Sequence, residues 1–200
     1  LKKIGDKVII AWTDVINAFG GEETSREKLS SIGISCAIYD TQTNTMGEEI
    51  SIVHDRYLTL NPQIDVDGDM LYISYVKLDV SKWGNSNSDL LQLEKSFSNI
   101  AYVKYDMNTG KSYDETIIPI PHKTISSPIA LDYNSATINI NNESYLISSY
   151  TIDEDEDLQT GDDRELYLQI QNLTTGQAYF PIQITNDSIS NSLPKLTNIN

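Results

Sequence analysis

The chain has 200 residues, of which 39% are hydrophobic and 22% charged, a composition that can build a sizeable folded core and is unlike that of a disordered protein. Acidic residues outnumber basic ones by 29 to 14, and the formal net charge is −15. This charge repels phosphate groups, so we expect neither nucleic acid nor an anionic membrane surface as a partner. No apolar run reaches the length of about 18 residues that a membrane-spanning helix needs.

Cys36 is the one cysteine, so no disulfide can form within the chain. Its neighbours from Ile34 to Ile38 are typical of a strand. We therefore expect a small buried thiol, because a reactive cysteine needs a basic and partly exposed setting.

Two sequence landmarks recur with one period. Pro62, Pro128 and Pro194 are evenly spaced, and an alternating apolar stretch follows each of them. The stretch Tyr39-Asp40-Thr41-Gln42-Thr43 matches residues 105–110, and a diverged copy lies at residues 171–176. These three stretches are separated by the same interval as the three prolines. Two landmarks that share a period predict a structural repeat of about 66 residues.

Each repeat unit is expected to hold four short strands, here lettered A to D, because Val, Ile, Tyr and Thr dominate four runs in each. Strand A follows the proline. The expected B, C and D strands, in chain order, are Lys7–Trp12, Ile34–Tyr39 and Glu49–Val53, then Met70–Tyr75, Ile100–Tyr105 and Thr116–Ile120, then Tyr145–Tyr150, Leu166–Ile170 and Phe180–Ile184. Asp67-Gly68 is expected to turn between A and B of the second unit, and Asn108-Thr109-Gly110 between C and D. No segment shows sustained helical periodicity, and the best candidate for a helical turn or two is Ser88–Phe97.

A proline-led strand A, an aromatic residue at the end of strand B and a Tyr-Asp-x-x-Thr stretch at strand C resemble the β-propeller repeats of bacterial secreted and cell-surface proteins. The layout is similar to that of sialidase-type and kelch-type blades, although neither the Asp-box nor the Gly-Gly pair of those blades occurs. The resemblance implies an all-β propeller of four-stranded antiparallel blades, located outside a bacterial cell or on its surface.

Three blades are expected, in residues 1–60, 61–126 and 127–192, and residues 193–200 are interpreted as the first strand of a further blade. Propellers typically have four to eight blades around a channel. Three blades would leave two sheets with open edges and a half-covered core. We therefore expect these residues to be a fragment of a larger propeller, whose remaining blades come from the same chain or from a second chain that closes the ring.

The antiparallel order places the B–C and D–A loops at one end of the blades and the A–B and C–D turns at the other. The B–C loops are long, roughly residues 13–33, 77–98 and 151–164. Long loops on a rigid scaffold commonly carry binding sites, so we expect the site at this end, although surface loops also simply tolerate insertion.

A pair of polar residues follows strand D in each unit. These pairs are His54-Asp55, His122-Lys123 and Asn186-Asp187. In a propeller this position borders the central channel, where such side chains can bind a metal ion or a polar ligand. The simpler interpretation is that they cap strand ends and face water, because the spacing of the two histidines matches no metal site.

Aromatic and acidic residues in the B–C loops are further candidates. Phe19 and Trp83 lie beside glycines, which suits stacking on a sugar or contact with a protein, or else anchors the loop on its blade. Asp153, Asp155 and Asp157 alternate as the ligands of a Ca²⁺ site do, yet the EF-hand pattern is not met, and a solvated acidic loop is the alternative.

No complete catalytic motif is present, and no cofactor other than Ca²⁺ is suggested. Our leading hypothesis is therefore a non-catalytic binding or scaffold propeller that takes a glycan or a protein through its long-loop end. The alternative is a glycoside hydrolase-like enzyme with acidic residues at the channel mouth, drawn from Asp14, Asp55, Asp79 and Asp153. A structural spacer between other domains is a third possibility.

Overall fold

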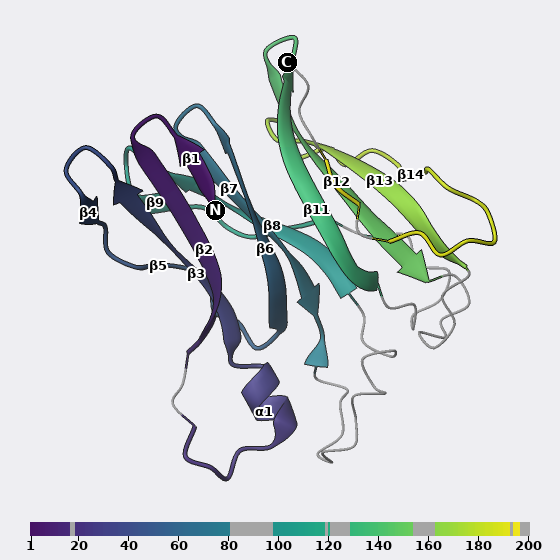
Figure 1. Ribbon diagram of the computed structural model, residues 1–200, viewed down its shortest axis with the longest axis horizontal. Coiled ribbons are helices and arrows are strands. Elements are labelled where there is room, and N and C mark those ends of the chain that lie inside the picture. The colour runs from purple at the N-terminus through teal and green to yellow at the C-terminus, as the bar shows by residue number, and fades with distance from the viewer. Residues whose placement is uncertain are drawn as a thin grey trace.

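Three antiparallel β-sheets follow one another along the chain in the computed structural model and lie side by side (Figure 1). The structure describes residues 1–16, 19–80, 98–118, 120, 129–153, 163–192 and 194–196. This part of the chain is all-β apart from one short helix, which confirms the expected class. Within it, no helix has both the length and the apolar character that crossing a membrane would require.

Each sheet is a meander in which the first strand pairs with the second, the second with the third, and the third with the fourth. Sheet 1 contains β1 (Lys2–Ile4), β2 (Lys7–Val15), β3 (Ile32–Asp40) and a fourth strand in two pieces, β4 (Thr45–Met46) and β5 (Ile50–Val53). Sheet 2 contains β6 (Leu58–Asp67), β7 (Met70–Leu78), β8 (Ser98–Asp106) and again two pieces, β9 (Lys111–Ser112) and β10 (Thr116–Ile118). Sheet 3 contains β11 (Ile129–Ile140), β12 (Glu143–Asp153), β13 (Arg164–Asn172) and β14 (Ile182–Gln183).

The expected B, C and D strands are confirmed in all three sheets, the B and C strands being longer than predicted and the D strands shorter. Strand A of sheet 2 differs from the prediction, because β6 begins at Leu58 and Pro62 lies inside it. The register of β6 against β7 shifts between Leu60 and Gln63, and Asn61 has a positive φ of 56°. A proline is tolerated at such a bulge because no ladder hydrogen bond is required of its nitrogen.

The predicted turn between β6 and β7 is confirmed at Gly68, which has a positive φ of 59° that glycine adopts without strain. The one helix among the described residues, α1 (Ser25–Leu29), lies in the first B–C loop, where no helix was predicted. The helical turn expected at Ser88–Phe97 lies outside the described residues.

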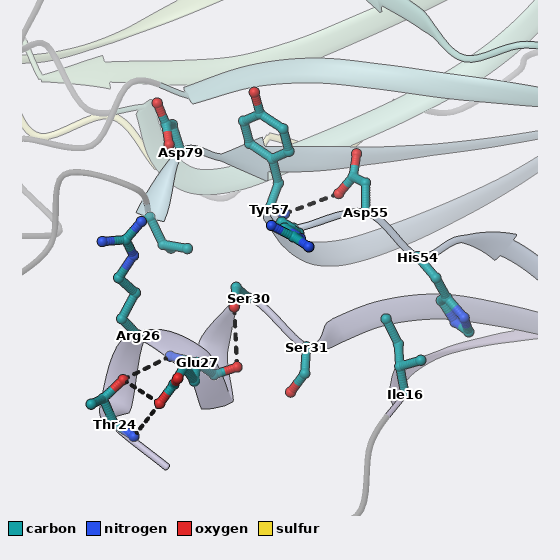
Figure 2. Close-up of a pocket in the computed structure, with 12 residues that line it drawn as sticks. Ile16, Thr24, Arg26, Glu27, Ser30, Ser31, His54, Asp55, Tyr57 and Asp79 are labelled. Atoms are coloured by element: carbon teal, nitrogen blue, oxygen red, sulfur yellow. Dashed lines mark hydrogen bonds between the residues drawn. The ribbon is translucent and has the colours of Figure 1, made fainter.

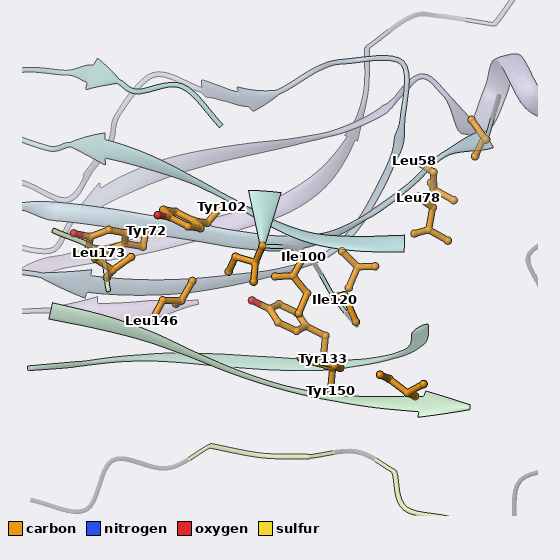
Figure 3. Packing of buried hydrophobic residues seen from close by; sticks show 14 residues of the cluster. Leu58, Tyr72, Leu78, Ile100, Tyr102, Ile120, Tyr133, Leu146, Tyr150 and Leu173 are labelled. Carbon is orange, nitrogen blue, oxygen red and sulfur yellow. The ribbon is translucent and has the colours of Figure 1, made fainter. Parts of the chain in front are cut away.

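The side chains of a strand alternate between the two faces of its sheet. In sheet 2 both faces carry apolar side chains, and both are covered by a neighbouring sheet. On β7, Leu71, Ile73 and Tyr75 pack into a cluster with sheet 1, while Tyr72 and Val76, on the other face, pack into a cluster with sheet 3. Figure 3 shows the second cluster, in which Tyr72 and Tyr102 of sheet 2 face Leu146 and other residues of sheet 3. Each fully buried side chain of this size removes apolar surface worth about 1.5–3 kcal/mol, so these two clusters hold the three sheets together.

Cys36 belongs to the cluster between sheets 1 and 2 and is fully buried, as expected. Burial raises the pKa of its thiol to about 12, so the unreactive protonated form is present at physiological pH.

The same strand register recurs in the three sheets, each time displaced by one period of the sequence repeat. The third strand pairs with the fourth through Cys36 and Ile50 in sheet 1, through Tyr102 and Thr116 in sheet 2, and through Leu168 and Ile182 in sheet 3. The turn after the third strand also recurs. In each sheet, a side-chain oxygen of Asp40, Asp106 or Asn172 accepts hydrogen bonds from the backbone N–H groups two and three residues later.

These turn hydrogen bonds make two of the three turns sensitive to acid. Bonds from Thr43 and Gln42 lower the pKa of Asp40, and bonds from Thr109 and Asn108 lower the pKa of Asp106. A carboxylate whose pKa is depressed by folding contributes stability above its unfolded pKa of about 3.9, and that contribution is lost as the pH falls through the folded pKa. Asn172 makes the same turn without titrating.

We predict that the double variant Asp40→Asn/Asp106→Asn is close to wild type in stability at pH 7 and loses less stability than wild type between about pH 5 and pH 2. Asparagine keeps the acceptor oxygen of the turn and removes the titrating group. Urea unfolding at a series of pH values measures the difference. If the two proteins lost stability in parallel over this range, the turns would not be a source of acid sensitivity.

Candidate functional site

A cleft of about 890 Å³ lies at the end of the sheets where the B–C and D–A loops of sheet 1 meet the end of β7 (Figure 2). Antiparallel strand order requires these loops to share one end. The cleft is lined by Ile16, Thr24, Arg26, Glu27, Ser30 and Ser31 of the B–C loop, by His54, Asp55, Arg56 and Tyr57 of the D–A loop, and by Asp79 and Val80 after β7.

Helix α1 forms one wall of the cleft and is held by a capping box. The hydroxyl oxygen of Thr24 accepts a hydrogen bond from the Glu27 backbone N–H at 3.3 Å, and the Glu27 carboxylate accepts one from the Thr24 backbone N–H at 2.8 Å. The bonds that Thr24 donates lower the pKa of Glu27. The Thr-x-x-Glu pattern at residues 24–27 is the sequence signal that would have predicted this helix.

The D–A loop forms the opposite wall, and Gly33 of β3 lets it approach closely. A Cβ atom at Gly33 would collide with the imidazole ring of His54 and the backbone oxygen of Val53, so a larger residue would displace the loop. The loop then turns at Asp55, whose Oδ1 accepts a hydrogen bond from the Tyr57 backbone N–H at 3.0 Å. Tyr57 remains 40% exposed at the edge of the cleft.

Beneath Tyr57, a buried lysine joins sheet 1 to sheet 2. Lys77 of β7 is 7% exposed, and its ammonium group donates to the carboxylates of Asp55 and Glu115, the latter at 2.6 Å. The same ammonium lies 4.4 Å from the centre of the Tyr57 ring, within the range of a cation–π contact. The hydroxyl of Tyr75 donates a further hydrogen bond to Glu115. A second hollow of about 360 Å³ adjoins the cleft here, and Tyr57 and Asp79 line both.

The charge state of this cluster is set by burial and by its internal bonds. Burial acts to lower the pKa of Lys77, but the hydrogen bonds to Asp55 and Glu115 outweigh it and the pKa lies above its ordinary value. Burial also raises the pKa of Tyr75, and the hydrogen bond to Glu115 raises it further. At neutral pH, Lys77 is therefore a fixed cation and Tyr75 a neutral donor, and neither group is available as a base.

The arginine side chains of the cleft are unpaired within the described part of the chain, whereas two of its acids are already engaged. Asp55 is bonded to Lys77 and to the turn at Tyr57, and Glu27 caps α1. In contrast, the side chains of Arg26 and Arg56 form no ion pair or hydrogen bond with any described residue. These are two of the three arginines in the whole chain. The cleft therefore presents guanidinium donors beside an exposed aromatic ring.

The structure brings together His54, Asp55 and Asp79 from the predicted site and places other candidates elsewhere. Phe19 is 42% exposed in the same loop as α1, where the Lys28 ammonium lies 6.0 Å from its ring, but it does not line the cleft. Asp14 lies in β2 and accepts a hydrogen bond from the Ser35 hydroxyl at 3.2 Å. Neither Phe19 nor Asp14 belongs to the cleft.

The remaining candidates lie in sheet 3 or outside the described residues. Asp187 caps a turn by accepting the Ile189 backbone N–H at 2.9 Å, and Asn186 beside it is exposed. Asp153 is fully buried at the end of β12 and pairs with Arg164 at 3.3 Å. Among the described residues, no group of three His, Cys, Asp or Glu side chains is arranged to hold a metal ion. The candidates outside the described residues are Trp83, His122, Lys123, Asp155 and Asp157.

Sequence reasoning missed Arg26, Arg56, Tyr57, Lys77 and Glu115. Lys77 had a signal, because it is the one charged residue in the otherwise apolar or uncharged β7. A charge in a strand buried on both faces requires a partner and marks a special site. The two arginines had no such signal, since exposed loop residues of this type are common.

No family model and no curated protein sequence matches the chain.

We predict that Lys77→Met destabilises the fold by about 1–3 kcal/mol, because it leaves Asp55 and Glu115 facing each other without a cation. The figure is below that for a fully buried pair because both carboxylates are partly exposed. Urea unfolding at pH 7 measures the loss, and Lys111→Met at the exposed β9 serves as the control with a small effect. The Lys77 contribution should persist below about pH 10 and decline as the pH rises through the raised pKa. Equal stabilities of the two variants would contradict a stabilising role for Lys77.

Proposed function

We propose that the chain forms three consecutive blades of a β-propeller, in residues 1–60, 61–126 and 127–192, with residues 193–200 beginning a further blade. The common strand order of the three sheets supports this, as does the periodic recurrence of the strand register and of the Asp40, Asp106 and Asn172 turns. Remaining blades would complete the ring. We also propose that the protein lies outside a bacterial cell or on its surface, because its repeats resemble those of bacterial secreted and cell-surface propellers.

We further propose that this propeller is a non-catalytic module that binds a glycan in the cleft between sheets 1 and 2. The observation that carries the proposal is the contrast between the cleft's arginines and its engaged acids. Arg26 and Arg56 line the cleft without a side-chain partner among the described residues, beside the exposed ring of Tyr57, whereas Asp55 and Glu27 are bonded within the protein.

These groups favour a sugar that bears a carboxylate. An exposed aromatic ring offers a stacking surface for the apolar face of a sugar, and a guanidinium can bind a carboxylate through two parallel hydrogen bonds. A protein ligand is less favoured, because interface hot spots are well-packed pockets and only Ile16 and Val80 add aliphatic side chains to this lining. The net charge of −15 disfavours a densely charged polymer, so we expect occasional acidic sugars in an otherwise neutral chain.

The glycoside hydrolase alternative is less well supported by the same contacts. Hydrolysis needs two carboxyl groups beside the sugar, one of which donates a proton. Asp55 and Glu115 are both bonded to Lys77, and Glu115 also accepts from Tyr75, so their oxygens are occupied within the protein.

We predict that the protein binds a xylotetraose carrying one glucuronate at least tenfold more tightly than unbranched xylotetraose, because only the former offers a carboxylate to the arginines. Arg26→Ala and Arg56→Ala should each remove much of this preference, and Tyr57→Ala should weaken binding of both sugars about tenfold. Isothermal titration calorimetry measures the affinities.

Lys111→Ala is the matched control, because it removes one positive charge at the opposite end of the sheets. Binding that is unchanged in all three cleft variants would place the glycan elsewhere. Binding of acidic peptides in the cleft, with no binding of either sugar, would identify a protein ligand instead.

We predict no turnover of chromogenic glycosides by the wild-type protein, because the Asp55 and Glu27 carboxylates of the cleft are engaged within the protein. Prolonged incubation at pH 5 and pH 7 with release of the chromophore as readout tests this. Turnover that Asp55→Asn or Asp79→Asn abolishes would establish the hydrolase alternative.

A further inference from the structure

The outer face of sheet 3, which points away from sheet 2, is apolar in the part that flanks the turn between β11 and β12. On β12, Leu146 and Tyr150 pack toward sheet 2, so the alternating residues Tyr145 and Ile147 lie on the outer face. This face contains a shallow hollow of about 220 Å³ lined by Ile138, Ile140, Tyr145, Ile147, Ile170 and Tyr179. A soluble protein rarely leaves a contiguous apolar surface without a use.

Equivalent faces of the other two sheets are covered. Cys36 of β3 is buried against sheet 2, and Tyr102, its equivalent one repeat later on β8, is buried against sheet 3. Leu168, the equivalent in the next repeat on β13, lies on the outer face of sheet 3 and is only half-buried. The outer face of sheet 3 is therefore the position where the pattern of the first two sheets places another sheet.

Asp187, in the loop after sheet 3, makes the same turn hydrogen bond as Asp55 in the loop after sheet 1. Asp55 and Asp187 occupy equivalent positions two repeats apart, and each accepts through Oδ1 the backbone N–H two residues later, at 3.0 Å from Tyr57 and 2.9 Å from Ile189. The second oxygen of Asp55 binds Lys77 of the following sheet. The second oxygen of Asp187 has no partner among the described residues.

We propose that the outer face of sheet 3 binds a fourth sheet, which packs as sheet 2 packs on sheet 1 and presents a lysine or arginine to Asp187. The inference rests on the propeller proposal and names the chemistry of the missing partner. Its face is apolar opposite Ile147, Leu168 and Ile170, and its basic residue occupies the place that Lys77 occupies in sheet 2.

Sheet 1 of a second copy of this chain does not meet this description. Its outer face is suitably apolar at Val8, Ile10 and Trp12, which alternate with the inward-facing Ile9 and Ala11, but its residue in the place of Lys77 is Asp14. The register shows the equivalence, because Asp14 pairs with Gly33 while Lys77 pairs with Asn99, the residue equivalent to Gly33 in the next repeat. Asp14 would therefore meet Asp187, and two carboxylates facing each other oppose association.

This mismatch supplies a test that needs only the chain itself. In the variant Asp14→Lys, the new ammonium group would stand beside Glu49 as Lys77 stands beside Glu115, and sheet 1 would become a suitable partner for sheet 3 of a second copy. We expect the wild type to associate weakly and Asp14→Lys to associate at least tenfold more tightly in sedimentation velocity. The additional change Asp187→Asn, which keeps the turn acceptor and removes the charge, should reverse the gain, and so should Ile170→Lys.

Asp69→Lys is the matched control, because it makes the same charge change in the exposed turn at the opposite end of sheet 2. Circular dichroism checks that each variant folds, and Asp187→Lys, which places the new cation on the other side of the contact, replaces Asp14→Lys if the latter does not fold. The proposal is overturned if neither variant associates more tightly than the control, or if the wild type forms a stable dimer through this face.

Sugar binding by the same samples separates the two proposals. A variant that fails to associate but still binds the glucuronate-bearing sugar in its cleft would refute the fourth sheet and leave the proposed binding function intact. Tighter association of Asp14→Lys without any sugar binding would support the fourth sheet and refute the proposed binding function.

Discussion

The structure depends on one constraint, which is that both faces of sheet 2 are apolar and must be removed from water. Its second strand alternates Leu71, Ile73 and Tyr75 on one face with Tyr72 and Val76 on the other, and a neighbouring sheet on each side covers them. The side-by-side arrangement in Figure 1 follows from this requirement. The same requirement makes the apolar hollow on the outer face of sheet 3 informative, because Ile147 and Ile170 continue a pattern that is satisfied elsewhere in the molecule.

Stacking the sheets in this way creates the cleft. The D–A loop of sheet 1 extends past its own sheet and reaches the buried ammonium group of Lys77 in sheet 2. The loop that carries Asp55 is therefore anchored by a charged contact across the junction, while the neighbouring Arg56 and Tyr57 line the cleft where a ligand would meet them. Under the function we propose, Asp55 serves stability while Arg56 and Tyr57 serve recognition, as loops on a rigid scaffold commonly do.

The strands and turns were accessible from sequence because they depend on local pattern. Alternating apolar residues predicted the strands from Lys7, Ile34 and Met70 onward, and Asn108-Thr109-Gly110 predicted a turn that hydrogen bonds to the Asp106 side chain then hold. The bulge at Pro62 and the short helix after Thr24 were missed. The first depends on the register against β7, and the second on a capping signal of only four residues.

By itself, the sequence determined the all-β class and the positions of the strands, since these follow from side-chain alternation and turn residues that act over a few positions. Tertiary structure alone decided which charges meet. Lys77 and Glu115 come together through strand pairing within sheet 2, and Asp55 reaches them from the loop of sheet 1 because the two sheets pack against each other. Asp187 has the same turn hydrogen bond as Asp55, but its second oxygen has no partner among the described residues. Ion pairing depends on distances across a junction between sheets, and no local pattern encodes those distances.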